Sequence, residues 1–245
     1  MAGLERYVRI LRLFDKGYGE WTIQAMSEAL GIPASTTYRL VRELVAQRFL
    51  DASTEANYRL GAAFIEFDRR VRITDPLIGL GLPFLQDLLA VAAIPASAVL
   101  ARLYGSEVIC VADAKSAQSQ ILSSYERGRP MPLLRGATSK AVLAQLPTRQ
   151  LNKILAAVDA GAAPRIPDSL KRDLAEIRQR GYSVTHGEVD QGLVGLAAPV
   201  NFEDSAIVAS MSLIVRADHL TPDIERRIIV NLVTATKVLS EQRKG

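Results

Sequence analysis

Two short amphipathic segments near the start of the chain are separated by only three residues, Gly31-Ile32-Pro33. The helical spacing of the apolar residues predicts one short helix that ends at Gly31 and another from about Ala34 to Arg48. Proline suits the first turn of the second helix, because its missing N–H would have no intrahelical partner there. The pattern therefore predicts two helices joined by a tight turn.

The second of these helices has two chemically different faces. Its apolar face can pack on the other helices and carries Thr37, Leu40, Val41, Leu44 and Val45. Its opposite face carries Ser35, Thr36, Tyr38, Arg39, Arg42 and Glu43. Hydroxyls and N-terminal amides hold phosphates, and arginine reaches guanine edges in the major groove. For an isolated helix, an ordinary solvated face is the more common explanation.

The flanking segments change that balance in favour of DNA. An earlier amphipathic helix is predicted from a stripe of five residues, Leu4, Tyr7, Val8, Leu11 and Phe14. Residues 49–52 and 58–60 read as two short strands around a polar turn at residues 53–57. Three helices followed at once by a hairpin predict a winged helix-turn-helix.

These residues resemble the N-terminal domain of the IclR family of transcriptional regulators. The resemblance is carried by Leu30-Gly31-Ile32-Pro33-Ala34-Ser35-Thr36-Thr37-Tyr38-Arg39-Leu40, then by Phe49-Leu50 and Tyr58-Arg59-Leu60-Gly61. In that family this turn and helix read operator DNA. The resemblance implies that five side chains lie at or near the DNA: Ser35, Thr36, Tyr38, Arg39 and Arg42.

The rest of the chain predicts an α+β domain. Helices are expected at residues 62–73, 76–91, 138–146, 167–180 and 222–241, and strands at 98–104, 107–112, 121–125, 182–186, 193–199 and 206–215. An antiparallel sheet flanked by helices matches the GAF-like effector domain of IclR regulators. We expect a DNA-binding domain at 1–61, a linker helix at 62–75 and an effector-binding and oligomerisation domain at 76–245.

Three further strings extend the resemblance over nearly the whole chain. They are Gly128-Arg129-Pro130-Met131-Pro132-Leu133 with the following residues 136–144, Arg180-Gly181-Tyr182 with residues 188–200, and Ala209-Ser210-Met211-Ser212-Leu213. The family implies a homodimer, often paired into a homotetramer, and two-fold symmetry suits a palindromic operator. The linker helix is expected to help form the dimer.

A small-molecule site is expected where a loop enters a helix at Gly136 and Ala137. Backbone amides at such a junction attract anions, Thr138 adds a hydroxyl, and Arg135 is placed to clamp a carboxylate. Ordinary helix capping with an exposed Arg135 is the alternative. In the IclR family, small organic acids or aromatic compounds bind between this junction and the sheet.

The resemblance assigns four more positions to this effector pocket. Ser210 and Ser212 match hydroxyls on the adjoining strand. Thr185 stands where members that bind very small acids have Asp, and Gly195 stands where they have Cys. These differences predict a roomier, less acidic pocket that suits a larger, aromatic carboxylate.

Composition is consistent with this interpretation without naming a partner. Residues 1–72 carry 11 basic and 9 acidic side chains, and residues 73–245 carry 19 and 17, so the net charge of +4 is not concentrated in one part. The single cysteine, Cys110, reads as a buried strand residue. With no signal peptide recognised, we expect a cytoplasmic protein without a membrane span.

An enzyme is the competing class of function. The sequence has no Gly-x-Ser-x-Gly elbow and no Walker-type phosphate loop, and His186, His219 and Cys110 do not form a metal-ligand pattern. Glu188 and Asp190 are close in sequence, but acids in a turn are usually solvated. We expect no catalytic residues, no metal and no cofactor. An enzyme with an appended winged helix stays as the alternative, and a winged helix that binds only protein is a third.

Overall fold

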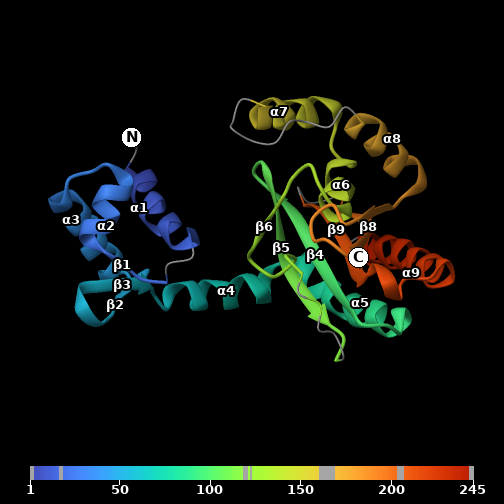
Figure 1. Ribbon diagram of the computed structural model, residues 1–245, viewed down its shortest axis with the longest axis horizontal. Helices are drawn as coiled ribbons and strands as arrows, with labels where there is room; N and C mark the ends of the chain where they lie inside the picture. The colour runs from blue at the N-terminus through green and yellow to red at the C-terminus, as the bar shows by residue number, and fades with distance from the viewer. Residues whose placement is uncertain are drawn as a thin grey trace. The chain divides into compact units, whose positions relative to one another are not determined.

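The computed structural model describes residues 3–16, 19–117, 121, 123–159, 169–202 and 207–242. The chain forms two units, unit 1 from Met1 to Asp75 and unit 2 from Pro76 to Gly245. Figure 1 shows unit 1 in blue to teal and unit 2 in green to red.

Unit 1 begins with four helical segments: α1 (Gly3–Leu11), the 3-10 helix η1 (Arg12–Lys16), α2 (Ile23–Leu30) and α3 (Ala34–Ala46). Thr22 caps α2 by accepting a 3.1 Å hydrogen bond from the Ala25 amide. Gly31 ends this helix with φ +64°, in the left-handed region that glycine adopts readily. The predicted helix–turn–helix is therefore confirmed.

Three short strands complete the winged helix: β1 (Trp21–Thr22), β2 (Leu50–Ala52) and β3 (Asn57–Leu60), with a 3-10 turn η2 (Thr54–Ala56) between β2 and β3. The sheet has the order β1-β3-β2 and is antiparallel. The predicted hairpin is confirmed, and Asp51 pairs with Arg59 in its register. The third strand, β1, has only two residues and shows no alternation that the sequence could reveal.

The core of unit 1 differs in one respect from the sequence pattern. It contains Ile10, Leu13, Met26, Leu40, Val41, Leu44 and Leu50. Of the predicted apolar stripe, Tyr7, Leu11 and Phe14 pack against this core, whereas Leu4 is 74% exposed and Val8 is 36% exposed. An apolar surface on α1 is thus left open.

Helix α4 (Ala63–Thr74) follows the wing, close to the predicted 62–73. Phe64 and Phe67 pack around Phe49, with ring centroids at 5.6 Å and 5.8 Å. Ile65 and Ile73 are 76% and 64% exposed. Helix α4 therefore packs on the wing through Phe64 and Phe67, and its apolar edge of Ile65 and Ile73 is exposed to solvent.

Unit 2 contains a six-stranded antiparallel sheet in the order β6-β5-β4-β9-β8-β7. Its strands are β4 (Ala96–Tyr104), β5 (Glu107–Lys115), β6 (Pro130–Met131), β7 (Ser183–His186), β8 (Leu193–Asn201) and β9 (Val208–Arg216). Its helical segments are α5 (Pro76–Ala92), α6 (Ala137–Leu143), α7 (Thr148–Asp159), α8 (Leu170–Arg180), η3 (Ala217–His219) and α9 (Pro222–Glu241). The α+β prediction is confirmed.

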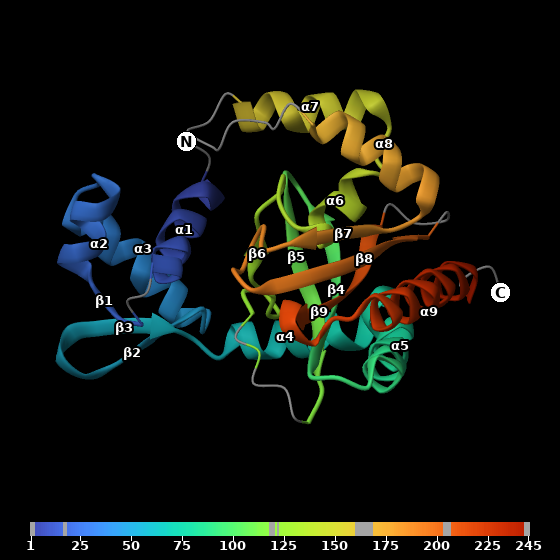
Figure 2. The same cartoon turned by 45° about the vertical axis from the view of Figure 1, so that its right-hand side comes forward.

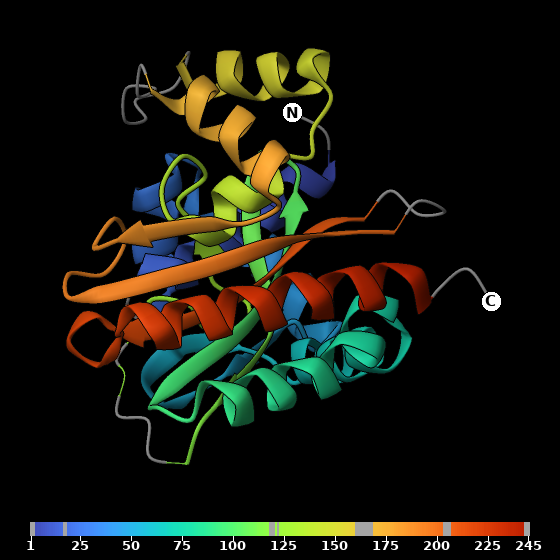
Figure 3. The same cartoon turned by 90° about the vertical axis from the view of Figure 1, so that its right-hand side faces the viewer.

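The sheet of unit 2 separates two hydrophobic cores. Figures 2 and 3 show α5 and α9 along one face, and α6, with α7 and α8 beyond it, on the other. Alternation along β9 sends Met211 and Leu213 into the core with α5 and α9. The intervening residues, Ser210 and Ser212, therefore lie on the face that α6 covers.

Several boundaries in unit 2 differ from prediction. Helix α7 and strand β6 were not expected, and α6 ends at Leu143 rather than at residue 146. The strand expected at 121–125 is wrong for its described residues, 121 and 123–125, which are irregular. Residues 167, 168 and 206, at the edges of two expected elements, lie outside the described residues. Among the described helices, none alone is long and apolar enough to cross a membrane, although α4 and α5 taken together reach that length and composition.

Candidate functional site

Helix α3 presents the polar face that the sequence predicts. Ser35, Tyr38, Arg39 and Arg42 are exposed, and Thr36 is half-buried. Within the described part of the chain, neither Arg39 nor Arg42 forms a salt bridge. Both guanidinium groups are therefore available to an external acceptor.

The opposite face of α3 fixes the helix in unit 1. Thr37, Leu40 and Val41 are buried, and the Thr37 hydroxyl donates a 3.2 Å hydrogen bond to the Pro33 carbonyl. Pro33 is the N-cap residue of α3, and no side chain caps this end of the helix. Amides in the first turn of a helix have no intrahelical acceptor and can bind a phosphate. This start, next to two hydroxyl residues, is a suitable anion site on a firmly packed helix.

The wing adds a cation that the sequence analysis did not assign. Arg59 lies on β3 and is exposed. Strand β2 lies between α3 and β3 in the chain, and Asp51 of β2 is the register partner of Arg59. Arg59 is part of the string Tyr58-Arg59-Leu60-Gly61, which carries the family resemblance. The sequence gives no reason to assign it to DNA, because a charged residue in a strand near a turn is normally only solvated.

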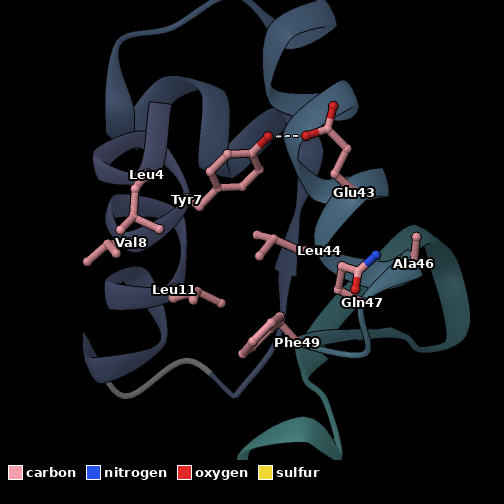
Figure 4. Close-up of a pocket in the computed structure, with 9 residues that line it drawn as sticks. All are labelled: Leu4, Tyr7, Val8, Leu11, Glu43, Leu44, Ala46, Gln47 and Phe49. Carbon is pink, nitrogen blue, oxygen red and sulfur yellow. Dashed lines mark hydrogen bonds between the residues drawn. The ribbon is translucent and has the colours of Figure 1, made fainter. Parts of the chain in front are cut away.

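An apolar groove of about 560 Å³ lies between α1 and α3. Figure 4 shows its lining residues, Leu4, Tyr7, Val8, Leu11, Glu43, Leu44, Ala46, Gln47 and Phe49. At its upper end the Tyr7 hydroxyl donates a hydrogen bond to the Glu43 carboxylate, which raises the pKa of Tyr7. The open stripe of α1 is thus one wall of a groove on unit 1.

In unit 2, the predicted effector residues converge where α6 meets the sheet. The Gly136 amide donates to Glu188 Oε2 at 2.8 Å, and the Ala137 amide donates to Thr185 Oγ1 at 2.9 Å. Gly136 has φ +84° and ψ 150°, a conformation essentially confined to glycine. Its lack of a side chain also matters, because a Cβ there would lie 2.4 Å from Tyr125 Oη.

The hydroxyls at this junction form a buried network. Thr138 Oγ1 donates to Ser212 Oγ at 2.9 Å, and Ser210 Oγ donates to the Thr138 carbonyl at 3.0 Å. All three residues are buried. Burial also raises the pKa of Tyr125 to about 12, although a hydrogen bond with Thr138 opposes that rise. The network ties α6 to β9 through polar contacts in an otherwise apolar layer.

Two carboxylates flank the junction. Lys140 Nζ lies 2.7 Å from Glu188 Oε1 and 3.4 Å from Asp173 Oδ2. Arg135, predicted as a carboxylate clamp, is exposed and donates to the backbone carbonyl of Glu188. The interpretation of Glu188 as a merely solvated acid is wrong, since it binds a buried lysine and a backbone amide.

The space beside this network is small. Tyr125, Thr185, Glu188, Val189, Asp190, Leu193, Gly195 and Ile214 line a cavity of about 10 Å³. That volume is about what a single water molecule needs. A Cβ at Gly195 would lie 3.5 Å from Ala137 Cβ, in ordinary contact. The cavity that Thr185 and Gly195 line is thus much smaller than the roomier pocket expected from the sequence.

No cluster of three or more His, Cys, Asp or Glu side chains suited to a metal occurs among the described residues. Cys110 is buried in β5, as predicted, and burial raises the pKa of its thiol to about 12. A thiol that resists ionisation is a poor nucleophile.

Comparison with known proteins matches both units. Residues 3–53 match the IclR helix-turn-helix domain, and residues 80–241 match the C-terminal domain of the bacterial transcriptional regulator IclR. The transcriptional repressor AllR of Klebsiella pneumoniae is 26% identical over 234 residues, which cover 90% of this chain and 82% of AllR. The transcriptional regulator RhmR of Escherichia coli is 27% identical over 218 residues, with 87% and 82% covered.

Solved structures show the same fold. An IclR transcriptional regulator from Silicibacter has a TM-score of 0.83 at 21% identity and covers all of this chain and 97% of its own. An IclR homologue of Microbacterium hydrocarbonoxydans, complexed with 4-hydroxybenzoate, has a TM-score of 0.75 at 20% identity, with 97% and 100% covered. The chain is a DNA-binding transcriptional regulator with a C-terminal effector domain and belongs to the IclR family.

Proposed function

We propose that α3 reads duplex operator DNA in the major groove, with Arg39 at a base edge. Ser35, Thr36, Tyr38 and Arg42 bind the neighbouring backbone. The observation that carries this assignment is the exposed polar face of a helix whose other face is buried. Arg59 in the wing adds a backbone contact. On this proposal the protein works in the cytoplasm and catalyses no reaction.

Substitution of Arg39 by alanine tests this assignment. The probe is a duplex selected from a random pool by the wild-type chain. Loss of a direct base contact costs about 1–3 kcal/mol, or about a five- to 150-fold rise in Kd. Loss of a phosphate contact by Arg42→Ala should lower the salt dependence of log K by about one ion.

Arg172→Ala is the matched control, because it removes the same charge from an exposed position on α8. Its Kd should stay at the wild-type value. Operator affinity that Arg39→Ala and Arg42→Ala leave unchanged contradicts the assignment of α3.

We propose further that a small organic acid binds where α6 meets the sheet. The site prefers a larger, aromatic carboxylate to a very small acid. Its carboxylate takes the amides of Gly136 and Ala137, and Arg135, Thr138, Thr185, Gly195, Ser210 and Ser212 surround it. This proposal is supported by the convergence of these residues and by the relative that is complexed with 4-hydroxybenzoate. An effector shifts operator affinity only if it binds two states of the protein unequally.

The effector proposal is tested by measuring operator affinity of the wild-type chain with and without candidate acids. One acid should change Kd for the operator by about fivefold or more. A two-carbon acid that binds more tightly than any benzoate refutes the preference for a larger carboxylate.

We propose that a second copy of the chain covers the groove between α1 and α3 and the apolar edge of α4. Leu4 and Val8 on α1 and Ile65 and Ile73 on α4 are exposed apolar side chains of the same unit, and contiguous exposed apolar surface is typical of interaction sites. A dimer also suits a palindromic operator, and pairing of dimers gives the tetramer.

Sedimentation of an Ile65→Glu variant tests this interface. A buried, unpaired carboxylate should shift the chain to monomers, because charge is costly to bury. Tyr104→Glu is the control, since Tyr104 is 60% exposed at a strand end in unit 2. A wild-type chain that sediments as a monomer at micromolar concentration refutes the dimer.

A further inference from the structure

The donors assigned to an effector carboxylate already have acceptors from the chain itself. Glu188 occupies one of them, since its Oε2 lies 2.8 Å from the Gly136 amide, and its Oε1 lies 2.7 Å from a further cation, Lys140 Nζ. Thr185 Oγ1 accepts from Ala137. A carboxylate is therefore present where the proposed function places the carboxylate of the ligand.

Glu188 reaches this place from a short connection between two strands. The connection runs from Gly187 to Gly192, between β7 and β8, and both glycines have left-handed φ values of +61° and +78°. The Glu188 side chain is 32% exposed, whereas that of Lys140 is only 11% exposed. The carboxylate thus enters from the solvent side and covers a donor that lies deeper.

The same connection is held closed at a second point. Asp190 Oδ2 accepts from the Ser124 amide at 2.9 Å, and Asp190 Oδ1 accepts from the Ser124 hydroxyl at 2.5 Å. Val189, between the two acids, lies against Gly136, since a Cβ there would be 2.7 Å from Val189 Cγ2. Glu188, Val189 and Asp190 all line the cavity of about 10 Å³.

A second carboxylate cannot join Glu188 at these donors. An amide has one hydrogen, and two carboxylates about 3 Å apart repel each other. Lys140 is also shared with Asp173, so this lysine already faces two carboxylates. An acid that binds here has to take the place of Glu188.

We propose that Glu188 is an internal ligand of the effector site and that the effector's carboxylate displaces it. This proposal rests on the proposed function, which assigns the site. One carboxylate replaces another at Gly136 and Lys140, and the segment from Gly187 to Gly192 swings outward. Affinity for an acid then depends on how tightly the chain holds its own glutamate, so Glu188 sets the affinity and the selectivity for acids over neutral compounds.

Calorimetry on the full chain tests the displacement, with 4-hydroxybenzoate and neutral 4-hydroxybenzamide as probes. Glu188→Gln keeps the shape of the side chain but loses the charge, so the internal ligand is held more weakly. We expect Glu188→Gln to lower the Kd for 4-hydroxybenzoate by about tenfold or more, because charge-assisted hydrogen bonds are roughly twice as strong as neutral ones. The Kd for the amide should change by less than about threefold.

Asp173→Asn is the matched control. It removes one negative charge beside Lys140 at 3.4 Å but does not touch Gly136. If Glu188 competes for the site, Asp173→Asn leaves acid affinity unchanged or lowers it, since Lys140 then holds Glu188 alone. Thermal unfolding of both variants without ligand verifies that they fold.

Three results overturn the proposal. One is an equal gain in acid affinity in both variants, which indicates simple charge repulsion. Another is weaker binding of both probes by Glu188→Gln, which indicates a structural role. The third is no acid binding by either wild type or Glu188→Gln. Failure of the proposed function is seen separately, as operator affinity that is insensitive to Arg39→Ala.

Discussion

Replacing Gly136 by alanine should destabilise unit 2 for two separable reasons. Gly136 has φ +84° and ψ 150°, and an alanine held there costs about 1–3 kcal/mol in backbone strain. The added Cβ would also lie 2.4 Å from Tyr125 Oη and 2.7 Å from Val189 Cγ2. Overpacking of this kind costs about 1–3 kcal/mol more. The expected loss in free energy of unfolding is therefore about 2–6 kcal/mol.

Gly128 is a control for the left-handed φ, because it lies in a turn closed by the hydrogen bond from the Arg129 amide to the Glu126 carbonyl. It has the same φ of +84°, but a Cβ there would meet nothing within 4 Å. Gly128→Ala should therefore cost only the strain, about 1–3 kcal/mol. The difference between the two variants reports the clash with Tyr125 and Val189 together with the strain that the ψ of 150° adds at Gly136.

Thermal unfolding of the full chain followed by far-UV circular dichroism measures both variants. For a domain of this size, each kcal/mol lowers Tm by about 2–4 °C. Trp21 is the only tryptophan and belongs to unit 1, so its fluorescence follows a transition that neither variant should shift. A Gly136→Ala variant no less stable than Gly128→Ala would refute the reasoning, because the contact distances would then have no energetic consequence.

Two further predictions concern the interior of unit 2. Thr138→Val and Ser212→Ala each break the 2.9 Å hydrogen bond between the two hydroxyls, and each should lower the free energy of unfolding by about 1–3 kcal/mol. The double variant should lose less than the sum of the two single losses. Urea unfolding of all three variants in a double-mutant cycle measures this coupling. Independent, additive costs would contradict this coupling. Burial raises the pKa values of Cys110 and Tyr125 to about 12 from 9.0 and 10.0, so the folded chain keeps protons that the unfolded chain loses. The free energy of unfolding should therefore fall as the pH rises from about 9 towards 12, and the Cys110→Ala, Tyr125→Phe double variant should show a shallower fall. An equally steep fall in that variant would assign the pH dependence to other groups.

Local periodicity is sufficient to predict unit 1 in outline. The turn at Gly31-Ile32-Pro33 and the two faces of α3 are properties of neighbouring residues, so the sequence predicts them directly. The open stripe on α1 has the same periodicity as a buried one, and only the packing shows that Leu4 and Val8 are left uncovered. The spacing of apolar residues distinguishes the apolar face of a helix from its polar face, but it does not show what packs on the apolar face.

The elements missed in unit 2 have two different explanations. Strand β6 contains only two residues, like β1 in unit 1, and two residues are too few for any alternation. Helix α7 does carry a helical spacing in Leu151, Ile154 and Leu155, so a search of that window finds it. A strand was expected at residues 121–125 because Ile121 and Tyr125 are apolar. Both side chains are buried, but a buried segment need not be a strand.

The effector site shows where prediction from sequence reaches its limit in physical terms. Alternation along β9 places Ser210 and Ser212 on one face, and a glycine at a loop-to-helix junction marks Gly136 as a donor. Each of these follows from local geometry. The acceptor for that donor is Glu188, 52 positions further along the chain, and it is brought there by the pairing of β7 with β8 under α6. A local pattern can thus predict which groups are able to bind a carboxylate. Whether the chain supplies that carboxylate itself depends on long-range topology, and this decides whether the site is open to an acid or must first release one.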